Sequence, residues 1–334
     1  MSLLDVQDLS ISIGRLAPLD AITFSLDKGE ILGIVGESGS GKSLTALSIM
    51  GLLPLIGGRI DRGHILFDGQ DLTRLSETSY RKLRGRRIAF ISQNPMTSLD
   101  PLIRVGAQID QVARLHLKLG ATEAKRHSID LMQQLRIPEA ATVYQQYPHH
   151  LSGGMKQRIV IAMALAADPD LIIADEPTTA LDVTIQAQII QILVDLVQSR
   201  DLALMLITHD MGVVAQACDR VVVLYAGRLA ESNTVQAIFD HPRHPYTSAL
   251  ISCIPRRGIA PGSLQGIPGT VPGVVNYPTG CRYHPRCNRA MATCHDQIPP
   301  FLSSQSGGQT LMPLKGVACH LFTPADINQD QPHV

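Results

Sequence analysis

A glycine-rich segment, Gly36–Ser43 (GESGSGKS), constrains this chain more than any other stretch of its sequence. It fits the pattern G-x-x-x-x-G-K-[ST], which forms a phosphate-binding loop when a strand precedes it and a helix follows it. The apolar run Ile31–Val35 precedes the segment, and the helix-compatible run Leu44–Met50 follows it. The segment therefore predicts an α/β fold that binds ATP at this loop.

Each residue of the loop has a predicted role in that binding. Lys42 brings a cation to the β and γ phosphates, and the hydroxyl of Ser43 ligates Mg²⁺. The positive N-terminal end of the following helix attracts the same anion. The remaining loop residues surround the phosphate oxygens with backbone N–H groups: Gly36, Glu37, Ser38, Gly39, Ser40 and Gly41.

Short apolar runs alternate with helical stretches along the chain, which is typical of an α/β fold with a mainly parallel core sheet. The predicted core strands are Ile31–Val35, Ile88–Ser92, Leu171–Ala174, Leu202–Thr208 and Val221–Tyr225. Two further strands, Leu3–Ser12 and Ala21–Leu26, have no helix between them and predict an antiparallel edge sheet. Helices at Gln108–Leu117 and Thr122–Leu135 predict a helical insert.

Polar side chains follow three of the predicted strands. Asp175 and Glu176 end one strand, Gln93 follows another, and His209 follows a third. The carboxyl ends of parallel strands meet at one edge of a sheet, where ligands bind. We expect Asp175 to hold Mg²⁺ and Glu176 to orient or deprotonate water. Gln93 would reach Mg²⁺ and water, and His209 would hydrogen-bond the γ-phosphate.

The composition favours a cytoplasmic protein of about two domains that does not bind nucleic acid. The chain has 334 residues, of which 45% are hydrophobic, and its 29 basic residues balance its 29 acidic ones. A nucleic-acid-binding protein usually carries a basic excess or a basic stripe. No apolar run reaches the ~20 residues of a membrane-spanning helix, and the N-terminus lacks the pattern of a secretory signal.

The segment Leu151–Arg158 (LSGGMKQR) resembles the signature of ABC transporter ATP-binding subunits, with Met155 at a position that is usually Gln. The order of loop, Gln93, signature, Asp175 and His209 is also similar, and Thr179–Asp182 resembles the D-loop. The resemblance covers residues 3–253. It implies an ABC-type P-loop ATPase domain at 1–255, with a helical subdomain at about 100–155, and a cysteine-containing C-terminal extension at 256–334.

The resemblance also implies how ATP is used. Two such subunits, here a heterodimer with a second ABC ATPase, close head to tail over two ATP molecules. The signature residues Ser152, Gly153 and Gly154 then contact the γ-phosphate held by the partner. Closing and reopening drives a membrane partner, and Gln93 carries the coupling together with the helical region behind it. Ile13 stands where the family usually has an aromatic residue that stacks on adenine.

The C-terminal part resembles the dipeptide and oligopeptide importer branch, because it contains His244–Thr247 (HPYT) and a cysteine-containing extension. This implies ATP hydrolysis that powers peptide uptake at the cytoplasmic face of the cell membrane. The partners would be two transmembrane permease subunits and an extracytoplasmic peptide-binding protein. Related importers of nickel, glutathione or peptide antibiotics remain alternatives, as does a soluble non-transport ABC ATPase, although the chain has one cassette and no heptad run.

Four of the six cysteines, Cys281, Cys287, Cys294 and Cys319, lie in the extension. Four thiolates suit zinc or an iron–sulfur cluster. Structural zinc sites usually contain short C-x2–4-C pairs, which this spacing lacks. The resemblance to the peptide-importer branch implies a [4Fe–4S] cluster, while zinc and free thiols remain alternatives.

Overall fold

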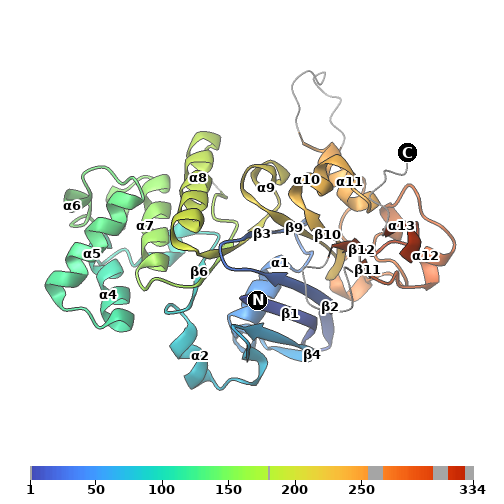
Figure 1. Cartoon of the computed structure of the whole chain (residues 1–334), viewed down its shortest axis with the longest axis horizontal. Helices are drawn as coiled ribbons and strands as arrows, with labels where there is room; N and C mark the ends of the chain where they lie inside the picture. The colour runs from blue at the N-terminus through green and yellow to red at the C-terminus, as the bar shows by residue number, and fades with distance from the viewer. Residues whose placement is uncertain (1, 180, 255–265, 304–314, 328–334) are drawn as a thin grey trace. The chain divides into compact units, whose positions relative to one another are not determined.

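The computed structural model describes residues 2–179, 181–254, 266–303 and 315–327. The chain forms two compact units, and most of their helices and strands are labelled in Figure 1. Unit 1 comprises Met1–Asp27, Leu32–Arg74 and Thr208–Val334, and unit 2 comprises Lys28–Ile31 and Leu75–Ile207.

Unit 1 contains a four-stranded antiparallel sheet in the order β2–β1–β4–β5. Its strands are β1 (Leu4–Ile13), β2 (Leu16–Leu26), β4 (Gly58–Phe67) and β5 (Gln70–Asp71). Leu4 of β1 lies opposite Leu26 of β2 and Phe67 of β4, and all three side chains are fully buried. The predicted antiparallel edge sheet is confirmed, although β2 begins five residues before Ala21.

A second group of strands in unit 1 carries the glycine-rich loop. β3 (Ile31–Val35) is parallel to β9 (Arg220–Tyr225), and β10 (Arg228–Thr234) is antiparallel to β9. β12 (Gly316–Val317) then pairs with β10, and β11 (Leu302–Ser303) pairs with β12. Two strands of the C-terminal extension therefore lengthen the sheet that positions the loop.

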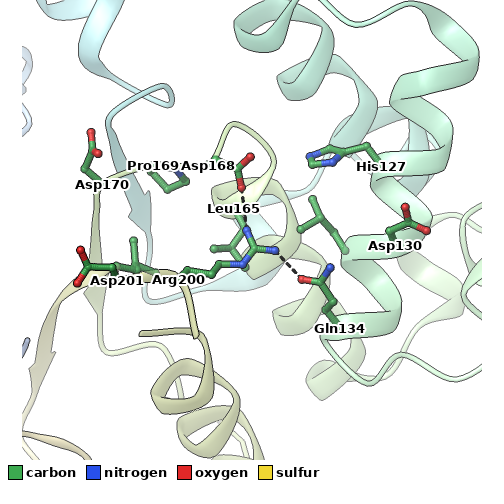
Figure 2. Close-up of a pocket in the computed structure, with 11 residues that line it drawn as sticks. His127, Asp130, Gln134, Leu165, Asp168, Pro169, Asp170, Arg200 and Asp201 are labelled. Carbon is green, nitrogen blue, oxygen red and sulfur yellow. Dashed lines mark hydrogen bonds and ion pairs between the residues drawn. The ribbon is translucent and has the colours of Figure 1, made fainter. Parts of the chain in front are cut away.

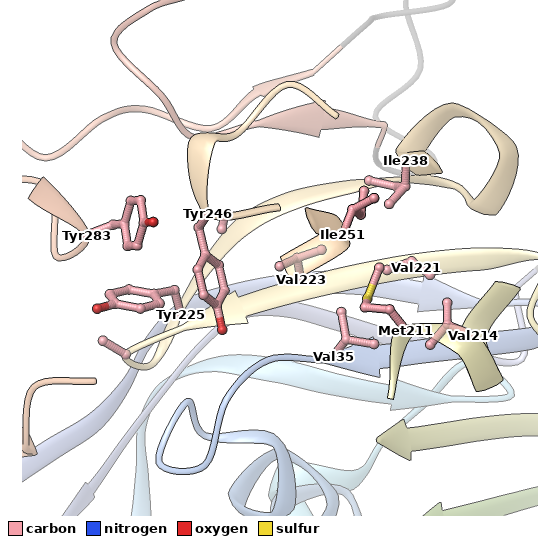
Figure 3. Packing of buried hydrophobic residues seen from close by; sticks show 12 residues of the cluster. Val35, Met211, Val214, Val221, Val223, Tyr225, Ile238, Tyr246, Ile251 and Tyr283 are labelled. Carbon is pink, nitrogen blue, oxygen red and sulfur yellow. The ribbon is translucent and has the colours of Figure 1, made fainter. Parts of the chain in front are cut away.

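Helices and an aromatic cluster complete unit 1. The rings of Tyr225, Tyr246 and Tyr283 contact one another with centroid distances of 4.6, 5.0 and 5.3 Å (Figure 3). They come from β9, from α11 and from the extension, so the extension contributes to the core. The helices of the unit are α1 (Lys42–Ile49), α9 (Met211–Ala217), α10 (Val235–Asp240), α11 (Pro245–Ser252), α12 (Thr293–Asp296) and α13 (Pro324–Ile327).

Unit 2 combines a parallel sheet with the predicted helical region. β7 (Leu171–Asp175) lies between β6 (Ile88–Ile91) and β8 (Ala203–Thr208), parallel to both. α4, α5 and α7 pack on one another. The helices of the unit are α2 (Glu77–Leu83), α3 (Pro95–Ser98), α4 (Val105–Leu117), α5 (Ala121–Gln134), α6 (Ala140–Val143), α7 (Gly153–Leu165) and α8 (Val183–Arg200). Of the helices in the described ranges, none is long and apolar enough to cross a membrane.

Candidate nucleotide-binding site

The glycine-rich loop lies between β3 and α1, as predicted. Gly36 has a φ of 152°, and a Cβ added there would lie 2.2 Å from the carbonyl oxygen of Leu224. Only glycine therefore allows the loop to leave β3 so close to the neighbouring strand β9. Gly41 is the N-cap of α1 and offers no side-chain acceptor to the first turn. The backbone N–H groups at this helix start are thus well suited to bind an anion.

The side chains of the loop also fit a triphosphate. Lys42 Nζ donates hydrogen bonds to the carbonyl oxygens of Gly36 and Glu37, at 2.7 and 3.2 Å. The hydroxyl of Ser40 is buried and has no hydrogen-bond partner among the described residues. Ser43, the predicted Mg²⁺ ligand, is exposed. A cation, a donor hydroxyl and an uncapped helix start match the chemistry of phosphate oxygens.

Two residues far along the chain hold the loop at Glu37. The backbone N–H of Glu37 donates to the hydroxyl of Tyr246, at 2.8 Å. The carboxylate of Glu37 accepts two hydrogen bonds from the guanidinium of Arg286, at 2.7 and 3.0 Å. Sequence analysis missed both contacts, because the partners are 209 and 249 residues away and no local pattern links them.

In unit 2, the structure brings two of the predicted catalytic residues together. Gln93 Nε2 donates to Glu176 Oε2 at 2.9 Å, and the hydroxyl of Thr179 donates to the same oxygen at 2.9 Å. Glu176 has a φ of 47°, a conformation that costs on the order of 1–3 kcal/mol and is held by surrounding contacts. Asp175, at the end of β7, is buried. Thr179 was not predicted as a site residue.

The predicted signature begins a helix of unit 2. Ser152 is the N-cap of α7, and its hydroxyl accepts a hydrogen bond from the backbone N–H of Met155 at 3.4 Å. Gly153 and Gly154 form the first turn. Ser152 and Gly153 are exposed, so this helix start is accessible in the single chain. Ala180 of the predicted D-loop lies outside the described residues.

The other predicted nucleotide contacts belong to unit 1. His209 is exposed and precedes Asp210, the N-cap of α9, whose carboxylate accepts the N–H groups of Gly212 and Val213. Ile13, at the position usually taken by an aromatic residue, is half-buried at the end of β1.

His244 and Glu231 are buried polar residues with structural roles. Nδ1 of His244 accepts the backbone N–H of Tyr246 at 3.0 Å and so caps α11. Burial lowers the pKa of His244 from 6.5 to about 4, so the ring is neutral at physiological pH. The Glu231 carboxylate accepts the backbone N–H groups of Arg243 and His244 at 2.9 Å each. This network fixes the helix that brings Tyr246 to the phosphate loop.

The predicted [4Fe–4S] cluster is wrong. Across the described residues, which include all four cysteines of the extension, no group of three or more His, Cys, Asp and Glu side chains is arranged to hold a metal ion. Burial raises the pKa of Cys281 and Cys287, and that of Cys319 to about 11. The four cysteines of the extension form no disulfide with one another.

A pocket of about 540 Å³ in unit 2 lies among α5, the segment before β7 and the end of α8 (Figure 2). Arg200 forms an ion pair with Asp168 at 2.8 Å and also donates to Gln134. None of the predicted nucleotide-binding residues lines this pocket. These contacts of Arg200 join the end of α8 to α5 and to the segment before β7, so they stabilise the packing of unit 2.

Comparison with known families places two matches on the chain. A family described as "ABC transporter" matches residues 19–179, a range that includes the phosphate loop and the carboxylate pair. A family described as "Oligopeptide/dipeptide transporter, C-terminal region" matches residues 230–294, a range that includes Tyr246 and Arg286.

Curated relatives resemble the chain over nearly its whole length. Oligopeptide transport ATP-binding protein AppD of Bacillus subtilis is 45% identical over 325 residues, covering 96% of this chain and 97% of the relative. Dipeptide transport ATP-binding protein DppD of Escherichia coli is 46% identical over 314 residues, covering 93% and 96%. Among solved structures, the ATP-binding cassette MJ0796 bound to ADP and Pi has a TM-score of 0.62 at 25% identity, covering 70% of this chain and 98% of that one.

Proposed function

The chain belongs to the ABC transporter family of ATP-binding subunits, and from that premise we propose that it hydrolyses ATP to power uptake of dipeptides or oligopeptides. Its fold is that of an ABC ATPase. One observation carries the peptide assignment. The similarity to peptide-transport subunits runs through the ATPase region and continues into the C-terminal region described for oligopeptide and dipeptide transporters.

In the proposed chemistry, some residues hold ATP and Mg²⁺, and others act on the attacking water. Lys42 and the N–H groups of Gly36–Ser43 would hold the phosphates of ATP. Ser43, Gln93 and Asp175 would hold Mg²⁺, which neutralises charge on the phosphates. Glu176 would orient or deprotonate the attacking water, and the hydrogen bond from Gln93 supports its orientation.

We propose a second ABC ATPase subunit, in a heterodimer, as the direct partner of this chain. Its signature would complete the site at the phosphate loop, while Ser152–Gly154 of this chain would complete the partner's site. The exposed start of α7 supports this arrangement. Two permease subunits and an extracytoplasmic peptide-binding protein would form the rest of the importer, with this chain peripheral at the cytoplasmic face of the membrane. His209 would contact the γ-phosphate.

Replacing Glu176 tests the proposed hydrolysis. Glu176→Gln should lower the rate of phosphate release by the assembled complex by about 100-fold or more, because a positioned general base contributes ~10²–10⁴-fold. ATP binding, measured by titration calorimetry, should persist, because the carboxylate acts on water. Glu139→Gln is a matched control, since Glu139 lies in the same unit and also has a positive φ of 46°. Normal turnover in Glu176→Gln would refute the role.

The cargo is tested in the complete importer. With permeases and binding protein reconstituted in vesicles, dipeptides or oligopeptides should stimulate ATP hydrolysis. Stimulation by nickel or glutathione, but by no peptide, would contradict the peptide assignment and leave the ATPase assignment intact.

A further inference from the structure

Arg286 of the C-terminal extension reaches the phosphate loop directly. Its side chain is only 5% exposed, and the side chain of Glu37 is 30% exposed. Nη1 donates to Oε2 of Glu37 at 2.7 Å, and Nη2 donates to Oε1 at 3.0 Å. Two parallel charge-assisted hydrogen bonds fix the direction of the carboxylate as well as its position.

The guanidinium of Arg286 is itself held by the surrounding unit. Nε donates to the carbonyl oxygen of Pro268 at 2.7 Å, and Nη1 also donates to the hydroxyl of Tyr225 at 3.3 Å. Burial alone would lower the pKa of Arg286, but its bonds to Glu37 and Tyr225 outweigh burial and raise the pKa above its ordinary value. Arg286 thus links a core strand and the extension to one loop residue.

Glu37 is consequently fixed at three points. Its carboxylate meets Arg286, its N–H meets the Tyr246 hydroxyl, and its carbonyl oxygen accepts a hydrogen bond from Lys42 Nζ. The last contact involves the cation predicted to bind the β and γ phosphates. A shift of Glu37 would therefore move both the loop backbone and a hydrogen-bond partner of Lys42.

We propose that Arg286 is a positioning residue for ATP binding, which holds the phosphate loop in its binding conformation through Glu37. The inference rests on the proposed binding of ATP by Gly36–Ser43. It assigns the extension a function in the nucleotide site that does not require a metal. Because coupling free energies are reciprocal, bound ATP should in turn stabilise the segment that contains Arg286.

Direct nucleotide binding by the full chain tests the proposal. Arg286→Gln should weaken ATP binding by about tenfold or more (about 1.4 kcal/mol), because the variant loses the charge-assisted hydrogen bonds that hold Glu37. Arg286→Lys keeps the charge without the forked geometry and should give an intermediate affinity. In the assembled complex, KM for ATP should rise more than kcat falls.

Arg228 provides the matched control. It forms a similar ion pair with Asp20, at 2.7 Å, and donates to the carbonyl oxygen of Gly280 in the extension, but it has no contact with Glu37. Arg228→Gln should keep wild-type ATP affinity. Weakening by both arginine variants to the same extent would overturn the proposal, because a general loosening of the extension would then explain it.

Two further variants make the outcome decisive. Lys42→Ala should abolish ATP binding; if it does so while Arg286→Gln binds ATP normally, the inference fails and the proposed function stands. If Lys42→Ala binds ATP normally, the proposed function itself fails. Should Arg286→Gln not fold, Glu37→Asp keeps the charge but shortens the reach, and wild-type affinity in this variant would overturn the proposal.

Hydrogen exchange gives a readout that does not depend on catalysis. ATP should slow amide exchange in residues 266–296 of the wild-type chain, and this protection should be lost in Arg286→Gln at ATP concentrations that saturate its site. Equal protection in the two proteins would contradict the link between loop and extension.

Discussion

His244 shows how a buried titratable residue contributes to the nucleotide site without lying in it. Its unprotonated Nδ1 caps α11 by accepting the N–H of Tyr246, and the hydroxyl of Tyr246 accepts the N–H of Glu37. The two hydrogen bonds connect the imidazole to the phosphate loop. Protonation of Nδ1 would remove the cap acceptor and place a charge in a buried position.

Stability should therefore fall in acid through His244. Between pH 6.5 and about 4 the unfolded chain binds a proton that the folded chain excludes, so lowering the pH reduces the free energy of unfolding, by up to about 3 kcal/mol. His244→Asn keeps a capping acceptor but does not titrate in this range. Denaturant titrations at pH 7 and pH 5 should show a smaller loss in the variant; equal losses would exclude this origin.

The candidate site residues that the sequence indicated are those whose position depends on local chain geometry, and their roles stay predictions. The glycine-rich loop combines a strand end, a turn and a helix start within a dozen residues, so its local structure follows from its pattern. Gln93 and Glu176 follow neighbouring parallel strands, and the structure joins them by a hydrogen bond. Arg286 could not be predicted, because its contact depends on the tertiary path of the extension. The cysteine pattern misled for a related reason, since closeness in sequence does not decide whether side chains are arranged to hold a metal ion.

At the scale of elements, burial on both faces made strands recognisable. β3, β7 and β8 are buried along their whole length, and the sequence predicted each to within one or two residues at its ends. β4 (GRIDRGHILF) was not predicted, because four of its ten residues are exposed and its charged residues interrupt the alternation. β10 was missed because its RLAESNT sequence has little strand character, although tertiary pairing with β9 and β12 buries it.

The start of α7 should be sensitive to one added methyl group. A Cβ at Gly154 would lie 2.7 Å from Cγ2 of Ile185, whereas a Cβ at Gly153 would lie 3.4 Å from Leu181. Gly154→Ala should therefore reduce stability by about 1–3 kcal/mol through overpacking, and Gly153→Ala should cost less. Denaturation midpoints measure both. Ile185→Ala should lower the free energy of unfolding less in the Gly154→Ala background than in the wild-type chain, because it removes the clash. If the two losses simply add, the steric cause is contradicted.

At the scale of the whole molecule, the extension is part of a core rather than an appendage. Tyr283 is 5% exposed against Tyr225 and Tyr246, and β12 pairs with β10. The boundary at 255/256 remains a prediction about sequence organisation. The described residues on both sides of it nevertheless pack within unit 1.

A chain that ends at residue 255 should consequently be unstable. It would expose the faces of Tyr225 and Tyr246 that Tyr283 covers, and loss of a buried aromatic side chain alone costs ~3–5 kcal/mol. Tyr283→Ala in the full chain removes the same aromatic side chain but keeps β12, so it separates the two contributions to stability. The chain contains no tryptophan, so circular dichroism would follow unfolding. A truncated chain with the wild-type midpoint would contradict this view.

The ion pair between Glu37 and Arg286 can form only late in the synthesis of the chain. Its partners are 249 residues apart, and at ~5–20 residues per second a ribosome needs about 12–50 s to make the intervening chain. A nascent chain thus carries its phosphate loop for most of its synthesis before the arginine exists. The ion pair that anchors the loop can form only after residue 286 has been made. A product truncated before that residue would therefore lack this anchor of its nucleotide site.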